Sequence, residues 1–152
     1  KLLDSINNFS FFKKIYILIW IFHPNSASIK KICKKKFNNY EIIFKPDNIL
    51  HVYKSCGFAI TACGTTVYEL IAHKISFSYI VLDKDQKQLS NFLIKNDIGN
   101  YLGSYKNLRN IKNNFNKFLK INHTKQRYKF QKIIKSSGLT FLIEQIIHFS
   151  KK

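Results

Sequence analysis

A loop of small residues between an apolar run and a helix-like segment is the part of the sequence best suited to chemistry. The apolar run Phe58–Ile60 leads into the loop Thr61–Thr66, and an apolar-periodic segment with Glu69 in its first turn follows. This order is typical of a strand, a loop and a helix N-terminus, where free backbone N–H groups attract an anion. Glycine in the loop either lets the backbone approach a ligand closely or adopts a positive φ. The pattern therefore predicts a phosphate or diphosphate site at Gly64, Thr65 and Thr66, although it matches neither G-x-G-x-x-G nor a Walker A sequence.

Two interpretations apply to Glu69, which lies three residues after Thr66. In a capping box, the Thr66 side chain accepts from the Glu69 N–H, and the Glu69 carboxylate reaches back to the start of the helix. In a nucleotide site, the same carboxylate accepts hydrogen bonds from ribose hydroxyls. The spacing alone favours the capping box.

Other side chains suggest little further chemistry. His23 follows an apolar run and is a candidate contact for phosphate or sugar, whereas the remaining histidines are expected at the surface or in packing. Asp83 and Asp85 are either a metal site or solvated loop acids, and we expect the latter. The three cysteines have no C-x-x-C spacing, which argues against a zinc site or a disulfide framework and indicates a reducing cytosol. The residues concerned are His51, His73, His123, His148, Cys33, Cys56 and Cys63.

Apolar runs alternate with amphipathic segments along the whole chain. The runs predict five strands, at Lys14–Phe22, Tyr40–Phe44, Phe58–Ala62, Phe77–Leu82 and Tyr101–Leu102. The amphipathic segments predict helices at Leu2–Asn8, from a Ser26 or Ser28 cap to Phe37, from Pro46, and at Thr66–His73, Asp85–Lys95, Leu108–Leu119 and Tyr128–Phe149. Such alternation predicts one α/β domain, a Rossmann-like parallel sheet flanked by helices. Ligands of such sheets bind beyond the carboxyl ends of the strands, here after Phe22, Phe44, Ile60 and Leu82.

The composition is that of one folded, strongly basic domain. The chain has 152 residues, 45% of them hydrophobic, and a formal net charge of +18 carried almost entirely by lysine. The charge indicates either a polyanion partner or a compositional bias, because Lys, Asn, Ile, Phe and Tyr are abundant together. A basic run, Lys30–Lys36, is either a solvated helix face or a weak contact for anionic lipid head groups. Apolar runs are too short to span a bilayer, so we expect a soluble cytoplasmic protein, at most peripheral to the membrane. Because the chain begins with Lys1 and lacks methionine, we expect a piece of something longer.

The segment Ala59–Leu70, followed by Asp83–Gln86, resembles the C-terminal half of family 28-type GT-B nucleotide-sugar enzymes. It looks most like the UDP-sugar hydrolase of pseudaminic-acid synthesis and its spore-coat polysaccharide relatives. In these enzymes a strand is followed by Ala-Gly-Gly-Ser/Thr-Thr, an aromatic residue and Glu, and later by a Gln. The segments His23–Asn25, Asn48 and Tyr101–Gly103 resemble further landmarks of the same group.

The resemblance implies a UDP-binding domain of a GT-B fold, without a metal or a cofactor. By position, the UDP diphosphate would be held by Gly64, Thr65 and Thr66, the ribose by Glu69, and the sugar or phosphate by Gln86 and His23. Two departures follow. Relatives carry Gly where this chain has Cys63, whose side chain is expected to crowd the diphosphate. The catalytic residues are expected in an N-terminal domain that is absent here, as is the first strand of the C-terminal half.

The sequence therefore predicts the UDP-binding half of a UDP-sugar hydrolase or a hexosyl or N-acetylhexosaminyl transferase of cell-envelope polysaccharide synthesis. Alone, this half is expected to be inactive. The alternatives are a basic RNA- or DNA-binding module and a non-catalytic remnant of the enzyme. Nucleic acid is not the expected partner, because no RRM-type aromatic and glycine motif is visible.

Overall fold

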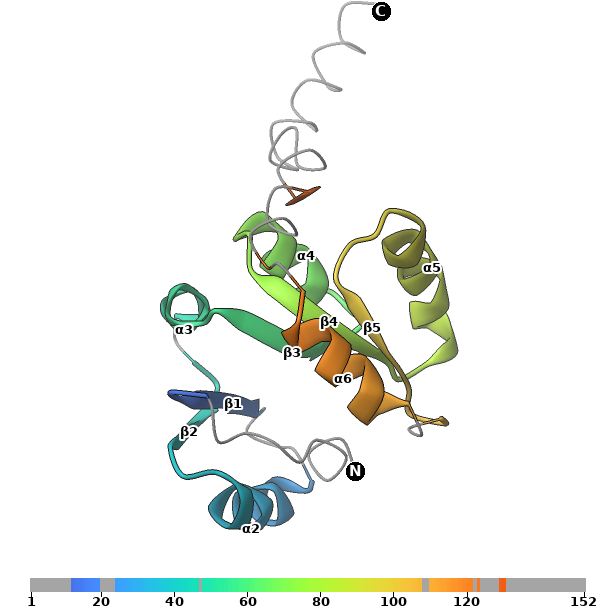
Figure 1. Ribbon diagram of the computed structural model, residues 1–152. Helices are drawn as coiled ribbons and strands as arrows, with labels where there is room; N and C mark the ends of the chain where they lie inside the picture. The colour runs from blue at the N-terminus through green and yellow to red at the C-terminus, as the bar shows by residue number, and fades with distance from the viewer. Residues whose placement is uncertain are drawn as a thin grey trace, which may run out of the picture.

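The computed structural model describes residues 12–19, 24–46, 48–107, 110–121, 123 and 129–130 (Figure 1). Strands and helices alternate throughout these ranges. The strands are β1 (Ile15–Ile19), β2 (Tyr40–Phe44), β3 (Phe58–Ala62), β4 (Ser76–Val81) and β5 (Asn100–Ser104). The helices are α2 (Ser26–Lys36), α3 (Ile49–Ser55), α4 (Thr66–Ala72), α5 (Lys87–Lys95) and α6 (Ile111–Leu119), with a short 3-10 helix, η1 (Lys84–Gln86).

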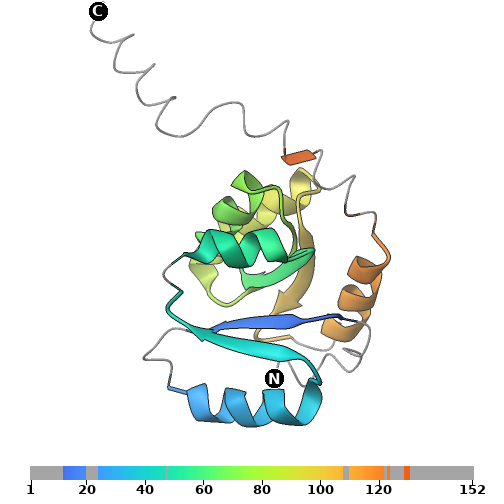
Figure 2. The ribbon, with the colours of Figure 1, turned by 90° about the vertical axis from the view of Figure 1, so that its left-hand side faces the viewer.

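Every ladder between these strands is parallel, and the ladders form two sheets. One sheet contains β1 and β2, and the other has the order β3-β4-β5. Both views show β1 on the side of β2 that is nearer to the larger sheet, with α2 beyond β2 (Figures 1 and 2). The predicted class is confirmed: the protein is an α/β protein with parallel sheets flanked by helices, consistent with a Rossmann-like fold.

The core of the larger sheet lies on both of its faces, as the two-residue alternation of β4 requires. Phe77, Tyr79 and Val81 point to the face covered by α4 and α5, where twelve buried residues form one cluster. Ile80 points to the opposite face, where it packs with Phe115 and other residues of α6. All six residues of β4 are buried, so this strand is the centre of a three-layer arrangement.

Two serines of β4 are fully buried beneath α6, and both have hydrogen-bond partners. The Ser76 hydroxyl lies 2.8 Å from Nδ1 of His123, and the Ser78 hydroxyl accepts from the Asn100 side chain at 3.4 Å. The Asn100 amide also donates to the backbone oxygen of Asn114 on α6 at 3.2 Å. Burying these polar groups is tolerated because they are paired.

Two helices end in the same way, and neither end has a glycine. After α4, Lys74 has a φ of 57° and the N–H of Ile75 donates to the oxygen of Leu70 at 2.8 Å. After α5, Asp97 has a φ of 53° and Ile98 donates to Leu93 in the same geometry. These are Schellman ends, in which a buried apolar residue follows the left-handed one. The strands that come next, β4 and β5, start within a few residues.

Most predicted elements agree with the structure, and the differences are local. The strands at Tyr40–Phe44 and Phe58–Ala62 have the predicted bounds. Ser26 is inside α2 rather than its cap, because Asn25 occupies the cap position without a side-chain hydrogen bond. The helix expected from Asp85 starts as a 3-10 turn, since Asp83 caps η1 by accepting from the Lys84 N–H. The helices predicted at Leu2–Asn8 and, for most of its length, Tyr128–Phe149 lie outside the described residues.

Candidate functional site

The loops after β3 and β4 lie side by side at the carboxyl edge of the larger sheet. The Cys63 N–H donates to the oxygen of Ile80 at 2.8 Å, which continues the ladder one residue beyond the end of β3. Ligands of open parallel sheets bind beyond this edge. The structure therefore brings the predicted diphosphate loop and the Gln86 loop to neighbouring positions.

Two backbone donors of the first loop remain available for a ligand. The Gly64 N–H donates to the Ala62 oxygen at 2.9 Å, and the next turns use the N–H groups of Val67 and Tyr68, each at 3.0 Å. The N–H groups of Thr65 and Thr66 have no acceptor among the described residues. The available donors thus belong to two of the three residues that the sequence predicts at the anion site.

Gly64 is in open space. A Cβ placed on it would meet no other atom within 4 Å, and its φ is not positive, since the positive-φ glycines are Gly99 and Gly103. Of the two alternatives for Gly64, the positive φ is therefore wrong, while close approach of a ligand remains compatible with the geometry. Thr65 is exposed and Thr66 is half-buried.

The capping box predicted for Thr66 and Glu69 is wrong. Thr66 is the first residue of α4, and the cap position, Thr65, makes no side-chain hydrogen bond. A carboxylate oxygen of Glu69 instead accepts from the Tyr53 hydroxyl of α3 at 2.7 Å. Burial, and then the bond to Glu69, raises the pKa of Tyr53, so this hydroxyl stays a donor at neutral pH. The ring of His73 packs 6.1 Å from that of Tyr53.

Tyr53 is the site residue that the sequence did not reveal. Sequence spacing relates Glu69 to its own helix, whereas α3 and α4 are brought together by their packing on one face of the larger sheet. Tyr53 is 4% exposed and belongs to the core cluster on that face. In the sequence, Tyr53 lies on the apolar face of a predicted helix. This position indicates that the side chain is buried, but it does not indicate that Glu69 accepts its hydrogen bond. The bond fixes one oxygen of an otherwise exposed carboxylate.

Cys63 does not crowd the loop, contrary to the prediction. Its side chain is 1% exposed and lies in the core cluster beneath α4. Burial raises the pKa of this thiol to about 11. The reason is the alternation of β3, which turns the side chains of Ala59 and Cys63 to the same face. At this position the predicted diphosphate loop is therefore lined by backbone.

Gln86 is held in place by its own loop. Its Oε1 accepts from the Leu82 N–H at 2.8 Å, so its Nε2 group is the part that can donate to a ligand. Asp83 and Asp85 are exposed beside it. No group of three His, Cys, Asp or Glu side chains within the described part of the chain is arranged to hold a metal ion. The three cysteines are free thiols.

The histidines divide as the sequence suggests, as far as they are described. His23 lies outside the described residues, as does His148. His51 and His73 are exposed on or beside helices. His123 is a packing residue, as predicted: besides its contact with Ser76, its ring stacks on Phe58 with centroids 5.8 Å apart. This places His123 at the amino end of β3, away from the candidate site.

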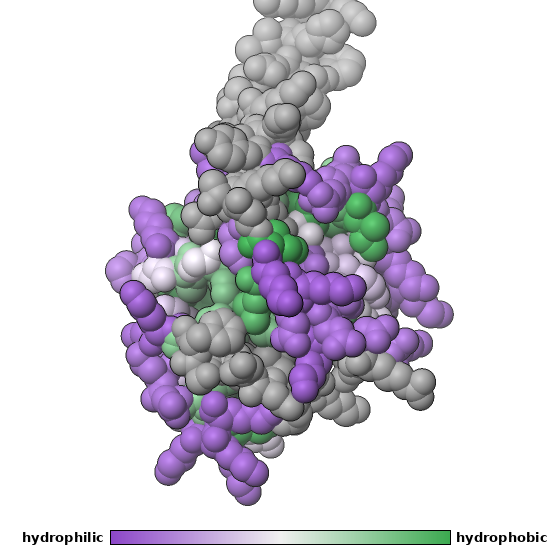
Figure 3. Space-filling view, viewed as in Figure 1, coloured by the Kyte–Doolittle hydropathy of each residue, from purple (hydrophilic) through white to green (hydrophobic). Residues whose placement is uncertain are grey.

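The basic residues of α2 form an outward face of the molecule. Lys30, Lys31, Lys34 and Lys35 are exposed, while the helix buries Cys33 beneath them. Hydrophilic residues cover the lower end of the molecule in Figure 3, where Figure 1 places α2. The Lys30 ammonium also lies 4.9 Å from the ring centre of Phe44. Across the described ranges, no helix is both long and apolar enough to cross a bilayer.

Comparison with known proteins adds no relative. No protein-family model, no curated protein and no solved structure matches the chain. The indications of function are therefore the fold class and the geometry of the loops at the carboxyl edge of the larger sheet.

Proposed function

We propose that this chain is the UDP-binding half of a nucleotide-sugar enzyme, either a UDP-sugar hydrolase or a glycosyltransferase of cell-envelope polysaccharide synthesis. The observation that carries the proposal is the loop after β3. Thr65 and Thr66 offer backbone donors without a partner among the described residues, and nothing stands within 4 Å of a Cβ at Gly64. A diphosphate has the charge and the acceptors that such a loop can bind.

Each further contact of the nucleotide has a candidate in the same region. Glu69 has one carboxylate oxygen held by Tyr53, which leaves the other to accept from ribose hydroxyls. The Nε2 group of Gln86, fixed through its Oε1 at 2.8 Å from the Leu82 N, is placed to donate to sugar or phosphate. His23, the remaining candidate, lies outside the described residues.

The reaction that such a site serves breaks the bond between sugar C1 and the diphosphate oxygen. The bonding electrons leave on the diphosphate, and water or an acceptor hydroxyl adds to C1 and gives up its proton. Backbone donors aimed at the diphosphate stabilise the charge that develops on this leaving group. The base and the acceptor site belong to the second half of the enzyme, and we expect this chain alone to bind UDP without turnover.

The fold gives less support to a nucleic-acid module. Helices cover both faces of the β3-β4-β5 sheet, whose two core clusters involve α4 and α5 on one side and α6 on the other. An RRM-type platform needs an open sheet face with exposed aromatic residues. The basic face of α2 is the remaining surface for a polyanion, and it suits equally a weak contact with anionic lipid.

Calorimetric titration tests the proposal directly. UDP, ADP and a short RNA are each titrated into the chain at two salt concentrations. We expect UDP to bind in preference to ADP with a small salt dependence. Binding of RNA alone, with an affinity that falls steeply with salt, would instead identify the basic module. Absence of any binding would favour the non-catalytic remnant.

A further inference from the structure

Two large apolar side chains are exposed next to each other at the carboxyl edge of the larger sheet. Leu82 directly follows β4 and is 48% exposed, and Tyr105 directly follows β5 and is 51% exposed. The Tyr105 N–H donates to the oxygen of Val81 at 3.0 Å, and Val81 pairs with Ser104 in the ladder of the two strands. One more step in this register places Leu82 opposite Tyr105, at the strand spacing of about 4.8 Å and on the same face.

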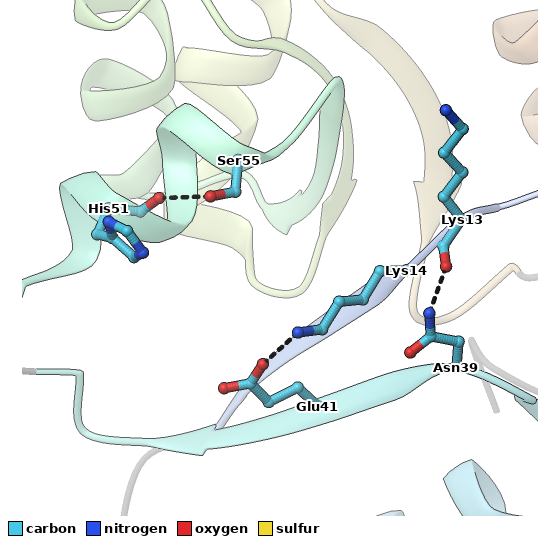
Figure 4. A network of polar contacts seen from close by, with 6 residues as sticks. All are labelled: Lys13, Lys14, Asn39, Glu41, His51 and Ser55. Carbon is cyan, nitrogen blue, oxygen red and sulfur yellow. Dashed lines mark hydrogen bonds and ion pairs between the residues drawn. The ribbon is translucent and has the colours of Figure 1, made fainter.

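The amino edge of the smaller sheet has a different character. There the Lys14 ammonium pairs with the Glu41 carboxylate at 2.7 Å (Figure 4). The Asn39 amide donates to the backbone oxygen of Lys13 at 2.6 Å. Five of the nine large apolar side chains that are exposed within the described ranges lie instead near the carboxyl ends of strands or in the turn that follows, namely Leu18, Phe44, Tyr68, Leu82 and Tyr105. Scattered exposed apolar residues are normal, whereas their gathering at one edge indicates a binding surface.

The candidate contacts of the nucleotide lie in a row along this edge. Figure 1 shows α3, α4 and α5 one after another across the larger sheet. Glu69 of α4 turns toward α3, because it accepts from the Tyr53 hydroxyl at 2.7 Å. Gln86 directly precedes α5 and is therefore on the other side of α4. A nucleotide with its ribose at Glu69 and its diphosphate at the loop after β3 directs the sugar toward Gln86 and the ends of β4 and β5.

Gln86 connects the candidate site to the two apolar residues. Its Oε1 accepts from the N–H of Leu82 at 2.8 Å, so its free amide group is held beside them. The ends of β3 and β5 are two strand spacings apart, about 10 Å, which a diphosphate and a sugar ring together span. Within the described part of the chain, the cation recorded against the Tyr105 ring is Lys106, 5.8 Å from the ring centre. This is near the limit of a cation–π contact and explains little of the exposed position of the ring.

We propose that Tyr105 and Leu82 form the platform on which the sugar ring of the nucleotide-sugar substrate lies. The faces of a pyranose ring present C–H groups, which are attracted to the negative face of an aromatic ring. Its hydroxyl groups lie around the rim, where the Gln86 amide can donate to one of their oxygens. The loop and Glu69 would recognise the UDP that all UDP-sugars share, whereas Tyr105 and Leu82 would distinguish one sugar from another. This inference rests on the proposed function and adds the residues that select the sugar.

Calorimetry with UDP, UDP-glucose, UDP-galactose and UDP-N-acetylglucosamine tests the platform on the full chain. We expect at least one UDP-sugar to bind about fivefold more tightly than UDP. Tyr105→Ala should abolish this difference and leave the affinity for UDP unchanged, and Leu82→Ala should reduce the difference. Tyr105→Phe keeps the ring and should preserve it. Tyr101→Ala is the matched control, because Tyr101 is an exposed tyrosine at the amino end of the same strand.

The outcomes separate this inference from the proposed function. Failure of UDP itself to bind would overturn both. UDP binding without preference for any of the three UDP-sugars would overturn the platform alone. Equal loss of UDP and UDP-sugar affinity in Tyr105→Ala would also overturn it, and would assign Tyr105 to the base or the ribose. Saturation-transfer NMR gives a second measurement: irradiation of the aromatic protons should saturate the C–H protons of the sugar in the wild type and much less in Tyr105→Ala, and equal transfer in the two proteins would contradict the stacking.

Discussion

Replacement of Gly64 by alanine is expected to stabilise the fold while weakening UDP binding. A Cβ there meets nothing within 4 Å, and the φ of Gly64 is not positive, so alanine fits without strain. Alanine also restricts the unfolded chain, which stabilises the native state by about 0.4–1 kcal/mol. For a chain of this length the melting temperature should rise by about 1–4 °C. The added methyl group occupies the space through which a diphosphate would approach Thr65 and Thr66, so we expect UDP affinity to fall at least tenfold, about 1.4 kcal/mol.

Gly57→Ala is the matched control for this experiment. Gly57 has the same open surroundings and no positive φ, but it lies at the amino end of β3, opposite to the candidate site. Thermal unfolding of both variants is measured with and without UDP, and affinity is measured by calorimetry. Both should be stabilised alike in the absence of UDP, and only Gly64→Ala should lose the stabilisation that UDP provides. Equal UDP affinities in the two variants would refute the placement of the diphosphate.

Three other perturbations test separate parts of the structure. Gly99→Ala should destabilise the protein by about 2–4 kcal/mol in urea unfolding, because φ is +66° and the new Cβ would lie 2.5 Å from the Phe77 ring. Glu69→Gln keeps an acceptor for the Tyr53 hydroxyl, so it should lower the free energy of unfolding by less than about 0.5 kcal/mol, whereas Tyr53→Phe should lower it by about 1 kcal/mol. Calorimetry should show at least fivefold weaker UDP binding in Glu69→Gln. Stability should also fall above pH 9, because the folded state holds the pKa of Cys63 at about 11 against 9.0 for a free thiol.

The sign and size of the alkaline effect follow from the direction of that shift. The unfolded chain loses the Cys63 proton before the folded chain does, so stability is complete below pH 9 and is lost as the pH rises through 11. Two pKa units correspond to about 3 kcal/mol at most. Cys63→Ala provides the control, since its stability relative to the wild type should rise across this window. A constant difference between the two proteins would contradict the burial of the thiol.

The Gly99→Ala and Glu69→Gln experiments each have an outcome that would contradict the structure or the proposed role. A cost below about 1 kcal/mol for Gly99→Ala would contradict the close packing of the Gly99 backbone against the Phe77 ring. If Glu69→Gln loses as much thermal stability without UDP as with it, the carboxylate has no role in binding ribose. In that case the bond with Tyr53 would be its whole contribution.

Much of the fold was predictable because its strands are local patterns. β2 and β3 are short apolar runs between turn residues, and their bounds agree with the prediction. The division of the sheet was not predictable, since the apolar character of β1 and β3 indicates burial on both sides but does not say which strand provides it. Which strands pair is decided by the packing of the whole chain and cannot be inferred from the local pattern of each strand.

The candidate site was predictable only in part, for a similar reason. The loop at Gly64 and the position of Gln86 follow from the order of strand, loop and helix. The partner of Glu69 does not, because Tyr53 lies sixteen residues away on another helix. The burial of Cys63 could have been inferred from the alternation that also directs Ala59 inward, but the resemblance to glycine-containing relatives outweighed that signal.

The attachment of β1 and β2 to the rest of the protein has a consequence for cooperativity. These strands pair with each other, and Phe12, just before β1, packs against Phe58 and Phe115 with ring centres 5.4 and 6.5 Å away. These few side-chain contacts couple the two sheets less strongly than a continuous hydrogen-bonded ladder between them would. The unit of β1, α2 and β2 should therefore open as a separate foldon of low free energy, while β4 exchanges its amide hydrogens only on global unfolding. On this account the molecule is two cooperative units on one chain, which should unfold in two separate transitions.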